Sequence, residues 1–511
     1  MSEKTSESKD HPSNPAHDII KKGSIITLIT LVSRPLGYVR EAVQAYLFGA
    51  TLLVDAFVVA FNFPELIQTL FFSGATSAFL VPVCTKYMKD DREYADIYST
   101  FINLSILITF FLSIFFFLFS GAIVKLIAPG FNPETKRITE VLFLIMVPVI
   151  ALHTILSVMK AFLNAKEHFA APELSGIIWN LVFILAAVFL SKRFGIYSLA
   201  IGVTLGSTLQ LAIQYPYLKK FNIRYRATLR MSHPSILEAK RLFTGALIAT
   251  SIVPINSFVG RIIASYLPHG EVASLAYAFR IFILPFSLFA VPVYTVMFTK
   301  ISTLFHEKDL QKIHAHIDGS IILLCITLIP STVLLCAAGE PIVRLLYERG
   351  AFTAKETALT SRALFGYGIG VLFYALSLSL VRVFNALHDT KTPALVGISS
   401  IVINAVLALL LMKRYDNLGI ALATSIVSLY NFSTLYLLLK RRIRYRLTKK
   451  SAKEIIKALL SGILLVFLIS AVNRSWSGEV YLTLLIDFLL TVLVCSLFFK
   501  DYYLAFLRRK S

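Results

Sequence analysis

The sequence predicts an all-α polytopic membrane protein with about 14 transmembrane helices, in two parallel six-helix lobes plus two C-terminal helices. Three observations lead there: composition, the placement of basic residues and an internal repeat. Hydrophobic residues make up 57% of the 511 positions, charged residues only 15%, and there are 40 phenylalanines. The mean hydropathy is +0.74. A soluble core does not need this much apolar sequence, so the chain belongs in a bilayer.

Apolar stretches of about 20 residues, long enough to cross a bilayer, recur along the whole chain. The first 20 residues are polar and lack an apolar core followed by a cleavage site, so we expect a disordered tail rather than a signal peptide. The predicted helices start near residues 23, 52, 98, 138, 172 and 196, then near 242, 271, 317, 358, 394 and 418, and a last pair covers 454–473 and 480–500.

Basic residues concentrate on every second connection between these helices. The connections of the other set carry little charge: residues 48–54 and 267–270 contain no Lys or Arg. The positive-inside rule therefore predicts that both termini are cytoplasmic. The net charge of +21 is then a signal of topology and of contact with anionic membrane lipids. No nucleic-acid-binding motif accompanies it, so nucleic acid is not an expected partner. The basic segments are 86–91, 219–230, 440–450 and 508–510.

The chain also repeats itself at an offset of 221 residues. An even number of helices per repeat gives both copies the same orientation, which predicts a cleft between two parallel halves and transport by alternating access. The matched pairs are Arg40 and Arg261, Gly49 and Gly270, Pro64 and Pro285, Phe131 and Phe352, and Asn164 and Asn385.

The spans, the basic segments and the repeat together predict the domain organisation. Each lobe is followed by a basic cytoplasmic segment, and the final helices lie outside the repeat. The predicted units are a disordered cytoplasmic tail (1–22), an N-terminal lobe (23–219), a cytoplasmic linker (220–241), a C-terminal lobe (242–440), a cytoplasmic loop (441–453), two extra helices (454–500) and a cytoplasmic tail (501–511).

Four arginines, Arg34, Arg40, Arg261 and Arg280, lie inside or at the edge of apolar spans. A charge at a helix centre costs roughly 2.5 to 3.5 kcal/mol on insertion scales, so it is tolerated mainly where it faces a protein interior or a water-filled cavity. A cationic cavity favours an anionic cargo. Guanidinium groups match pyrophosphate oxygens, and a carboxylate or sulfate would fit almost as well.

Structural alternatives remain for these arginines. Arg34 and Arg40 could extend toward a membrane surface, aided by Glu41. Arg280 has no acid within a helical turn and could pair with Asp55. Asn385 and Asp389 are one helical turn apart and could place two oxygens on an ion, or could simply cap a helix end.

Enzyme signatures are absent from the sequence. There is no HExxH, GxSxG, Walker A loop or DxD-like pair, and the two histidines of 314–316 are expected to be solvated. We therefore predict a transporter that uses no resident cofactor and does not hydrolyse ATP directly.

A series of motifs resembles, in order and approximate spacing, the MurJ/MviN family of bacterial lipid II flippases, over residues 23–500. The motifs are SRPLGYVREAVQAYLFG (33–49), VDAF (54–57), FSGATSAFLVPV (72–83), APGF (128–131), YERGAF (347–352) and FNALHDTKTP (384–393). This resemblance implies the fold of the multidrug/oligosaccharidyl-lipid/polysaccharide exporter superfamily, with the two extra helices forming a groove for the lipid tail. It also implies that lipid II, an undecaprenyl-pyrophosphate-linked disaccharide pentapeptide, moves from the cytoplasmic to the periplasmic leaflet of the inner membrane for peptidoglycan synthesis.

The resemblance also assigns residues. The family's cavity arginines fall on Arg34, Arg40 and Arg280, and its acid on helix two falls on Asp55. Three departures accompany them: Gln68-Thr69 replace paired arginines, Gly260 replaces an Asp, and Ile283 replaces an acid. Coupling to Na⁺ or H⁺ is described for the wider superfamily, and Asn385 and Asp389 are the positions to test here. Peptidoglycan synthesis enzymes are possible partners.

Two other functional hypotheses compete with lipid II transport. A related lipid-oligosaccharide flippase or a drug/cation antiporter would share the fold, although an antiporter should favour intramembrane acids over arginines. A membrane glycosyltransferase or polymerase acting on the same lipid would need an extracytoplasmic acid, and the outer loops are short and poor in acids.

Overall fold

The computed structural model describes residues 15–70, 74–475 and 479–499, and these residues are helical throughout apart from short connections. The first lobe contains α1 (Pro15–Phe48), α2 (Leu52–Gln68), α3 (Gly74–Lys86), α4 (Asp91–Leu118), α5 (Ser120–Ile127), α6 (Pro133–Ala165), α7 (Ala170–Phe194) and α8 (Tyr197–Lys220). The second contains α9 (Pro234–Ala264), α10 (Glu271–Pro285), the π-helix η2 (Phe286–Ala290), α11 (Val291–His306), α12 (Leu310–Ala337), α13 (Gly339–Tyr347), α14 (Ala354–Gly368), α15 (Val371–Ala386) and α16 (Lys391–Ile443). The helices α17 (Lys449–Ser475) and α18 (Val480–Phe498) complete the described chain.

Each predicted span falls on one of these helices. Eight helices of the described chain are long and apolar enough to cross a membrane, and nine if α14 and α15, bent by 45°, form one broken span. The long α16 is two helices joined at Asp416, whose backbone is not helical. The all-helical membrane fold is confirmed, and the number of 14 crossings stays a prediction.

Several boundaries differ from the sequence expectations. Helix α9 begins at Pro234, inside the segment expected to be a linker, and α1 begins at Pro15, inside the expected tail. The short helices α5 and α13 were not predicted as separate elements, because a stretch of eight or nine residues gives little periodic signal. Residues 1–14 and 500–511, which hold the rest of the two expected tails, lie outside the described residues.

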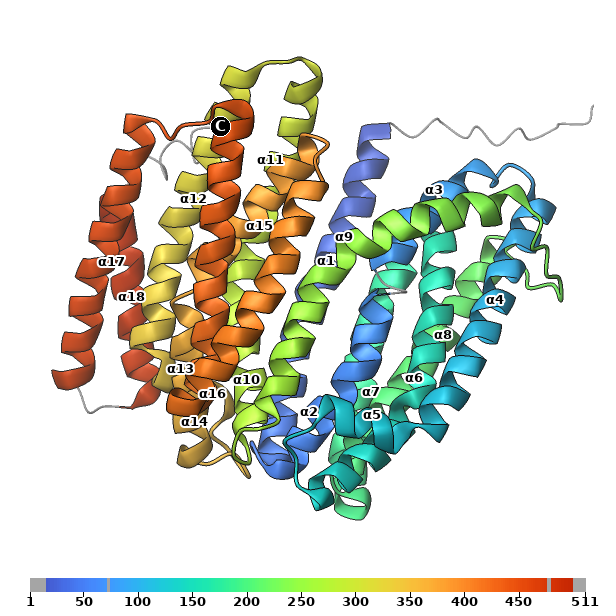
Figure 1. Cartoon of the computed structure of the whole chain (residues 1–511), viewed down its shortest axis with the longest axis horizontal. Coiled ribbons are helices and arrows are strands. Elements are labelled where there is room, and N and C mark those ends of the chain that lie inside the picture. The colour runs from blue at the N-terminus through green and yellow to red at the C-terminus, as the bar shows by residue number, and fades with distance from the viewer. Residues whose placement is uncertain (1–14, 71–73, 476–478, 500–511) are drawn as a thin grey trace, which may run out of the picture.

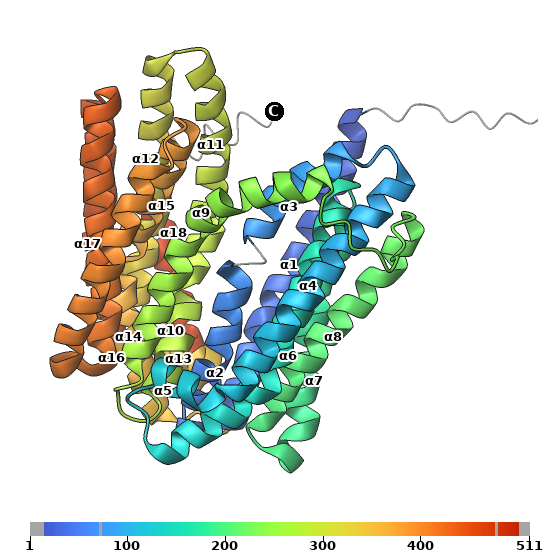
Figure 2. The ribbon, with the colours of Figure 1, turned by 45° about the vertical axis from the view of Figure 1, so that its right-hand side comes forward.

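The two lobes stand side by side and converge at the lower end in Figure 1, where helices α2, α5, α10, α13 and α14 lie close together. Toward the upper end, where α1 begins, most helices of the two lobes diverge. The first half of α9 is the exception: it reaches across to the first lobe and packs against α3, with the rings of Phe79 and Phe243 5.5 Å apart. Figure 2 shows the same arrangement after a 45° turn. Helices α17 and α18 pack against each other and against α12 on the outer side of the second lobe. We call the converging end the closed end.

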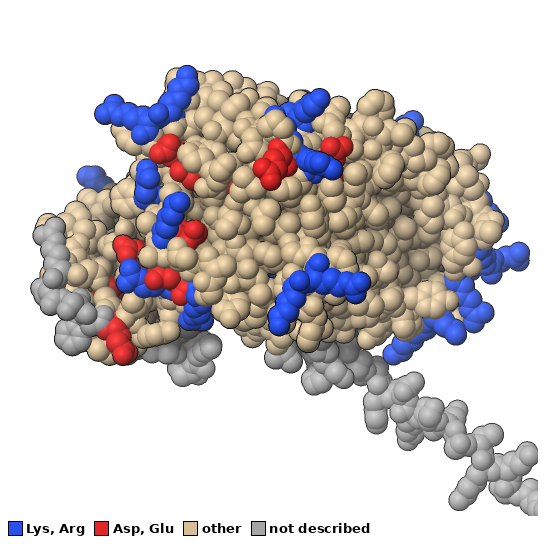
Figure 3. All heavy atoms as spheres, turned by 90° about the horizontal axis from the view of Figure 1, so that it is seen from below, with Lys and Arg blue, Asp and Glu red and all other residues tan. Residues whose placement is uncertain are grey.

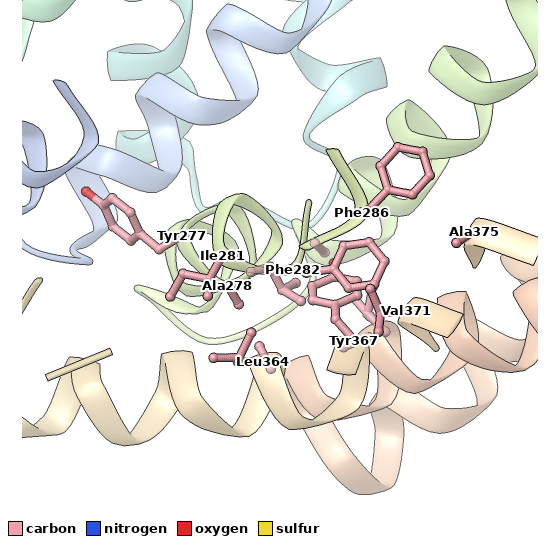
Figure 4. Packing of buried hydrophobic residues seen from close by; sticks show 14 of the residues in the cluster. Tyr277, Ala278, Ile281, Phe282, Phe286, Leu364, Tyr367, Val371 and Ala375 are labelled. Atoms are coloured by element: carbon pink, nitrogen blue, oxygen red, sulfur yellow. The ribbon is translucent and has the colours of Figure 1, made fainter. Parts of the chain in front are cut away.

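Aromatic and branched side chains hold α10 against its own lobe. The rings of Phe282 on α10 and Tyr367 on α14 lie 5.6 Å apart, and Ile281 and Leu364 belong to the same buried cluster (Figure 4). Lipid tails are as apolar as these side chains, so close packing rather than expulsion of water stabilises the contact. This packing fixes the helix that carries Arg280.

Candidate functional site

The intramembrane arginines converge on cavities between the lobes. Arg34, Arg40 and Arg280 line a cavity of about 650 Å³ between α1 and the α10–η2 segment. Arg40 and Arg280 also line a smaller cavity further inside, together with Arg261 from α9. The structure therefore brings together all four arginines that the sequence singled out. Two come from α1 in the first lobe and two from α9 and α10 in the second.

A carboxylate that the sequence reasoning undervalued binds two of them. Oε1 of Glu41, a residue only 8% exposed, lies 2.5 Å from Nη2 of Arg40 and 3.2 Å from Nε of Arg280. The suggested pairing of Arg280 with Asp55 is therefore wrong for this conformation, because Glu41 holds Arg280. Its position directly after Arg40 was visible in the sequence, but its contact with α10 was not.

Arg40 and Arg261 are equivalent in the repeat but have different neighbours. The Arg40 guanidinium stacks over Trp179 and Phe183 of its own lobe, 4.8 and 5.5 Å from the ring centroids. Arg261 instead crosses to α2 of the other lobe. There it donates a hydrogen bond to Asn62, and its Nη1 lies 3.5 Å from Oε2 of Glu65. Arg261 thus connects the two lobes. The sequence alone could not show this contact.

Asp55 lies at the closed end, where both carboxylate oxygens accept hydrogen bonds from the other lobe. The donors are the backbone N–H groups of Gly270, at 2.6 Å, and Ala273, at 2.7 Å. These groups begin α10, so the carboxylate caps the positive end of that helix. Asp55 is 2% exposed. In this conformation it joins the lobes, and its expected part in cargo binding stays a prediction.

Two repeat-equivalent glycines make the closed end possible. Gly49 and Gly270 both have positive φ, +64° and +86°. A Cβ atom on Gly49 would lie 2.5 Å from the carbonyl oxygen of Ala351, and one on Gly270 would lie 2.2 Å from that of Ala50. Each glycine therefore lets the backbone of the other lobe approach closely. The backbone N–H of Ala351 also donates to the carbonyl oxygen of Tyr46 at 2.8 Å.

The other predicted residues lie away from the arginines. Asp389 accepts hydrogen bonds from the backbone and hydroxyl of Thr392, and Nη1 of Arg442 lies 2.6 Å from its Oδ2. Asp389 thus caps the start of α16, the alternative that the sequence left open. Burial tends to raise its pKa, but the Thr392 hydrogen bonds and the Arg442 charge leave the pKa below its ordinary value. Asn385 lines a cavity inside the second lobe.

The departures from the family pattern can also be located. Gln68 is the last residue of α2 and is half-buried. Gly260 has open space around it, since no atom lies within 4 Å of an added Cβ. Ile283 lines the 650 Å³ cavity beside Arg280. Within the described ranges no group of three or more His, Cys, Asp or Glu could hold a metal ion.

A two-lobed helical membrane protein with a charged cavity between its lobes, closed at one end, belongs to the class of alternating-access transporters. Solved structures agree. An inward-facing multidrug resistance MATE family transporter of the MOP superfamily aligns with a TM-score of 0.67 over 80% of this chain and 94% of its own, at 13% identity, which shows the fold alone. A structure titled lipid II flippase MurJ, inward closed conformation, aligns with a TM-score of 0.81 over 94% of this chain and 99% of its own, at 29% identity.

Sequence comparison identifies the family. The family model for lipid II flippase MurJ matches residues 44–492. The lipid II flippase MurJ of Thermosipho africanus is 30% identical over 94% of this chain and 97% of its own length. A probable lipid II flippase MurJ of Buchnera aphidicola is 29% identical over 82% and 83%. The chain belongs to the MurJ family of lipid II flippases, and is a multi-pass protein of the bacterial inner membrane rather than an enzyme.

Proposed function

We propose that this chain moves lipid II from the cytoplasmic to the periplasmic leaflet by alternating access. The observation that carries the proposal is the convergence of Arg40, Arg261 and Arg280, from both lobes, on one cavity. A diphosphate offers several anionic oxygens in the geometry that guanidinium groups bind bidentately. Contacts to arginines of both lobes allow one bound head group to influence how the lobes sit.

Carboxylates contact three of the arginines. Glu41 contacts Arg40 and Arg280, and Glu65 lies 3.5 Å from Arg261. Each carboxylate carries one negative charge, whereas a diphosphate carries at least two. We infer that the head group competes with Glu41 and Glu65 for the guanidinium groups. Because the Arg280 and Arg261 pairs cross between lobes, this competition loosens the lobe contact as cargo binds.

The cavity between α1 and α10 supplies an entrance for a lipid. Apolar side chains, including Leu31 and Leu288, share its lining with Arg34 and Arg280. Each CH₂ group moved from an apolar to an aqueous environment costs about 0.8 kcal/mol, so a long prenyl tail stays in lipid while only the head group enters. The outer surfaces of α17 and α18, which expose Phe467 and Leu497, are the proposed groove for that tail.

The orientation follows from charge. The basic segments 86–91, 219–230 and 440–450 lie at the end where the lobes diverge (Figure 1). The opposite, closed end carries both basic and acidic residues on its surface (Figure 3). Helix α13 at that end has ion pairs of Arg344 with Glu340 and Glu348. By the positive-inside rule the diverging end and both termini are cytoplasmic. The closed end then faces the periplasm.

Reconstituted protein tests this function. Vesicles containing the full chain and lipid II are treated with a membrane-impermeant reagent that modifies the head group, and the protected fraction is followed over time. We expect the chain to expose lipid II several-fold faster than protein-free vesicles, and Arg280→Ala to abolish the gain. Arg344→Ala, which removes an arginine at the closed face, is the matched control and should keep full activity.

Two outcomes of this measurement would contradict the proposed function. Equal rates with and without protein would refute lipid II transport. Faster exposure of a lipid-linked oligosaccharide with a different sugar, but not of lipid II, would favour the related oligosaccharide flippase.

For coupling to an ion gradient, Asn385 and Asp389 remain the proposed positions, tested by comparing transport in Na⁺ and K⁺ gradients. Peptidoglycan synthesis enzymes remain proposed partners, tested by co-purification from the membrane.

A further inference from the structure

A second tract of space, made of two neighbouring cavities, leads from the arginines into the C-terminal lobe. Helices α9, α15 and α16 enclose a cavity of about 190 Å³ whose lining contains no Asp, Glu, Lys, Arg or His. It shares Asn256, Tyr374 and Thr424 with a neighbouring cavity of about 90 Å³, and that cavity is also lined by Arg261. The tract therefore continues from one of the arginines into an uncharged chamber.

Four hydroxyl groups that line the chamber donate their hydrogens to backbone carbonyl oxygens. Ser377, Ser400 and Ser428 donate to the carbonyl oxygens of residues three or four positions earlier in their own helices, at 2.9, 2.7 and 2.8 Å. Thr424 donates in the same way, at 3.2 Å. A hydroxyl that has donated its only hydrogen can still accept through its lone pairs. These four hydroxyls therefore offer acceptors to a ligand that donates.

Two amide oxygens in the tract lack partners. The Asn404 side chain is held in place because its Nδ2 donates to Oδ1 of Asn256 at 3.1 Å. Its Oδ1 has no hydrogen-bond partner among the described residues, although Asn404 is only 4% exposed. The Oδ1 atom of Asn431 also has no hydrogen-bond partner within the described chain. Buried polar atoms of native proteins are nearly always paired, so an unpaired acceptor beside a cavity points to a ligand that donates.

The chemistry of the wall selects the ligand. An uncharged, acceptor-rich wall does not attract phosphate, and without a carboxylate it gives a cation no charge compensation. It does suit hydroxyl and amide N–H groups, and Tyr374 adds an aromatic face against which a sugar ring can lie. We propose that this tract receives the neutral saccharide portion of the cargo head group while the arginines hold its diphosphate. The inference rests on the proposed function, since the cargo must be a glycosylated diphosphate lipid.

Binding by the purified full chain tests the subsite with two lipids. Undecaprenyl diphosphate has the same tail as lipid II and also a diphosphate, but no sugar, and its terminal phosphate has one more ionisable oxygen. Thr424→Val, which removes one oxygen at nearly constant shape, and Asn404→Leu should each weaken lipid II binding by about tenfold, the equivalent of one to one and a half hydrogen-bond contributions. Both variants should leave undecaprenyl diphosphate binding unchanged.

The control variant is Asn473→Leu on α17, whose Oδ1 is also unpaired within the described residues but which lies outside this tract. It should leave the binding of both lipids unchanged. Equal weakening of both lipids by Thr424→Val and Asn404→Leu, or no weakening of either, would overturn the saccharide subsite. So would a loss of Na⁺-dependent binding without discrimination between the lipids, which would identify a cation site instead. Failure of Arg280→Ala to weaken either lipid would refute the diphosphate site and so be distinguishable from failure of the subsite.

Discussion

The two lobes anchor their basic segments from corresponding helices but with different chemistry. Asp96 on α4 and Asp318 on α12 both anchor the basic segment that follows the last helix of their lobe. Asp96 lies 2.8 Å from Nη2 of Arg230 and 3.6 Å from Nη1 of Arg226. Asp318 instead accepts hydrogen bonds from neutral donors, the Tyr445 hydroxyl and Ser451 hydroxyl at 2.5 Å and the Thr448 backbone at 3.2 Å.

At one pair of repeat-equivalent positions the backbone conformation is nearly the same although the residues differ. Gly195 and Asp416 are repeat equivalents and have nearly the same conformation, φ 54° and ψ −135° against φ 50° and ψ −130°. Between the lobes the charges are complementary: the first contributes Glu41, Glu65 and Asp55, and the second contributes arginines and the start of α10. The repeat thus preserves shape, and differences in charge between its copies create the lobe interface.

Gly270→Ala should break the closed end most severely. The new Cβ would lie 2.2 Å from the Ala50 carbonyl oxygen, and the backbone has φ +86°. A side chain at such a φ alone costs on the order of 1 to 3 kcal/mol. We expect the distance between spin labels at Leu53 and Tyr266, in a background lacking the native cysteines, to increase and transport to fall by more than tenfold. Gly260→Ala is the control, and an unchanged distance in Gly270→Ala would contradict the backbone contact.

Asp55→Asn tests whether charge as well as shape joins the lobes. An amide offers one acceptor atom where the carboxylate offers two, and it loses the favourable interaction with the positive end of α10. We expect the ratio of closed to open molecules to fall by about tenfold, or about 1.4 kcal/mol, in the same spin-label measurement. Glu340→Gln removes an exposed charge at the closed end that pairs with Arg344 of its own lobe, and should leave the distance unchanged.

The two loop anchors should differ in their response to salt. Asp318→Asn should lower the free energy of unfolding by about 2 kcal/mol at any ionic strength, because the hydrogen bonds that it weakens are buried and their donors are neutral. Asp96→Asn should cost about 1 kcal/mol in low salt and less in high salt, since Arg226 and Arg230 are 42% and 54% exposed. Thermal unfolding in detergent at two salt concentrations measures both, and the same salt response for both would remove this distinction.

Asp416→Gly should have the smallest effect and the opposite sign. Gly195 shows which residue suits this backbone, and Asp416 gains only a weak contact with Arg362, at 3.9 Å. Relief of backbone strain should raise stability by about 1 kcal/mol, seen as a higher unfolding temperature. The reciprocal Gly195→Asp should lower it. A destabilised Asp416→Gly would show that the ion pair outweighs the strain.

Some features of the candidate site were predictable and others were not. Arg34, Arg40, Arg261 and Arg280 stand out because a charge in an apolar span is expensive wherever it lies. Glu41 was overlooked because its significance depends on Arg280, 239 positions away along the chain. Their contact leaves no local pattern in the sequence.

The sequence by itself determined the membrane helices, the repeat, the cationic cavity and the family, because apolar length, charge placement and ordered motifs are properties of the chain read in order. Only the tertiary structure decided which groups meet. It placed Glu41 between two arginines, Asp55 at the start of α10, and unpaired amide oxygens along the tract that leads from Arg261 into the second lobe. These relations arise when helices distant in sequence pack together, and packing in a bilayer depends on shape and hydrogen bonding rather than on hydrophobic pattern.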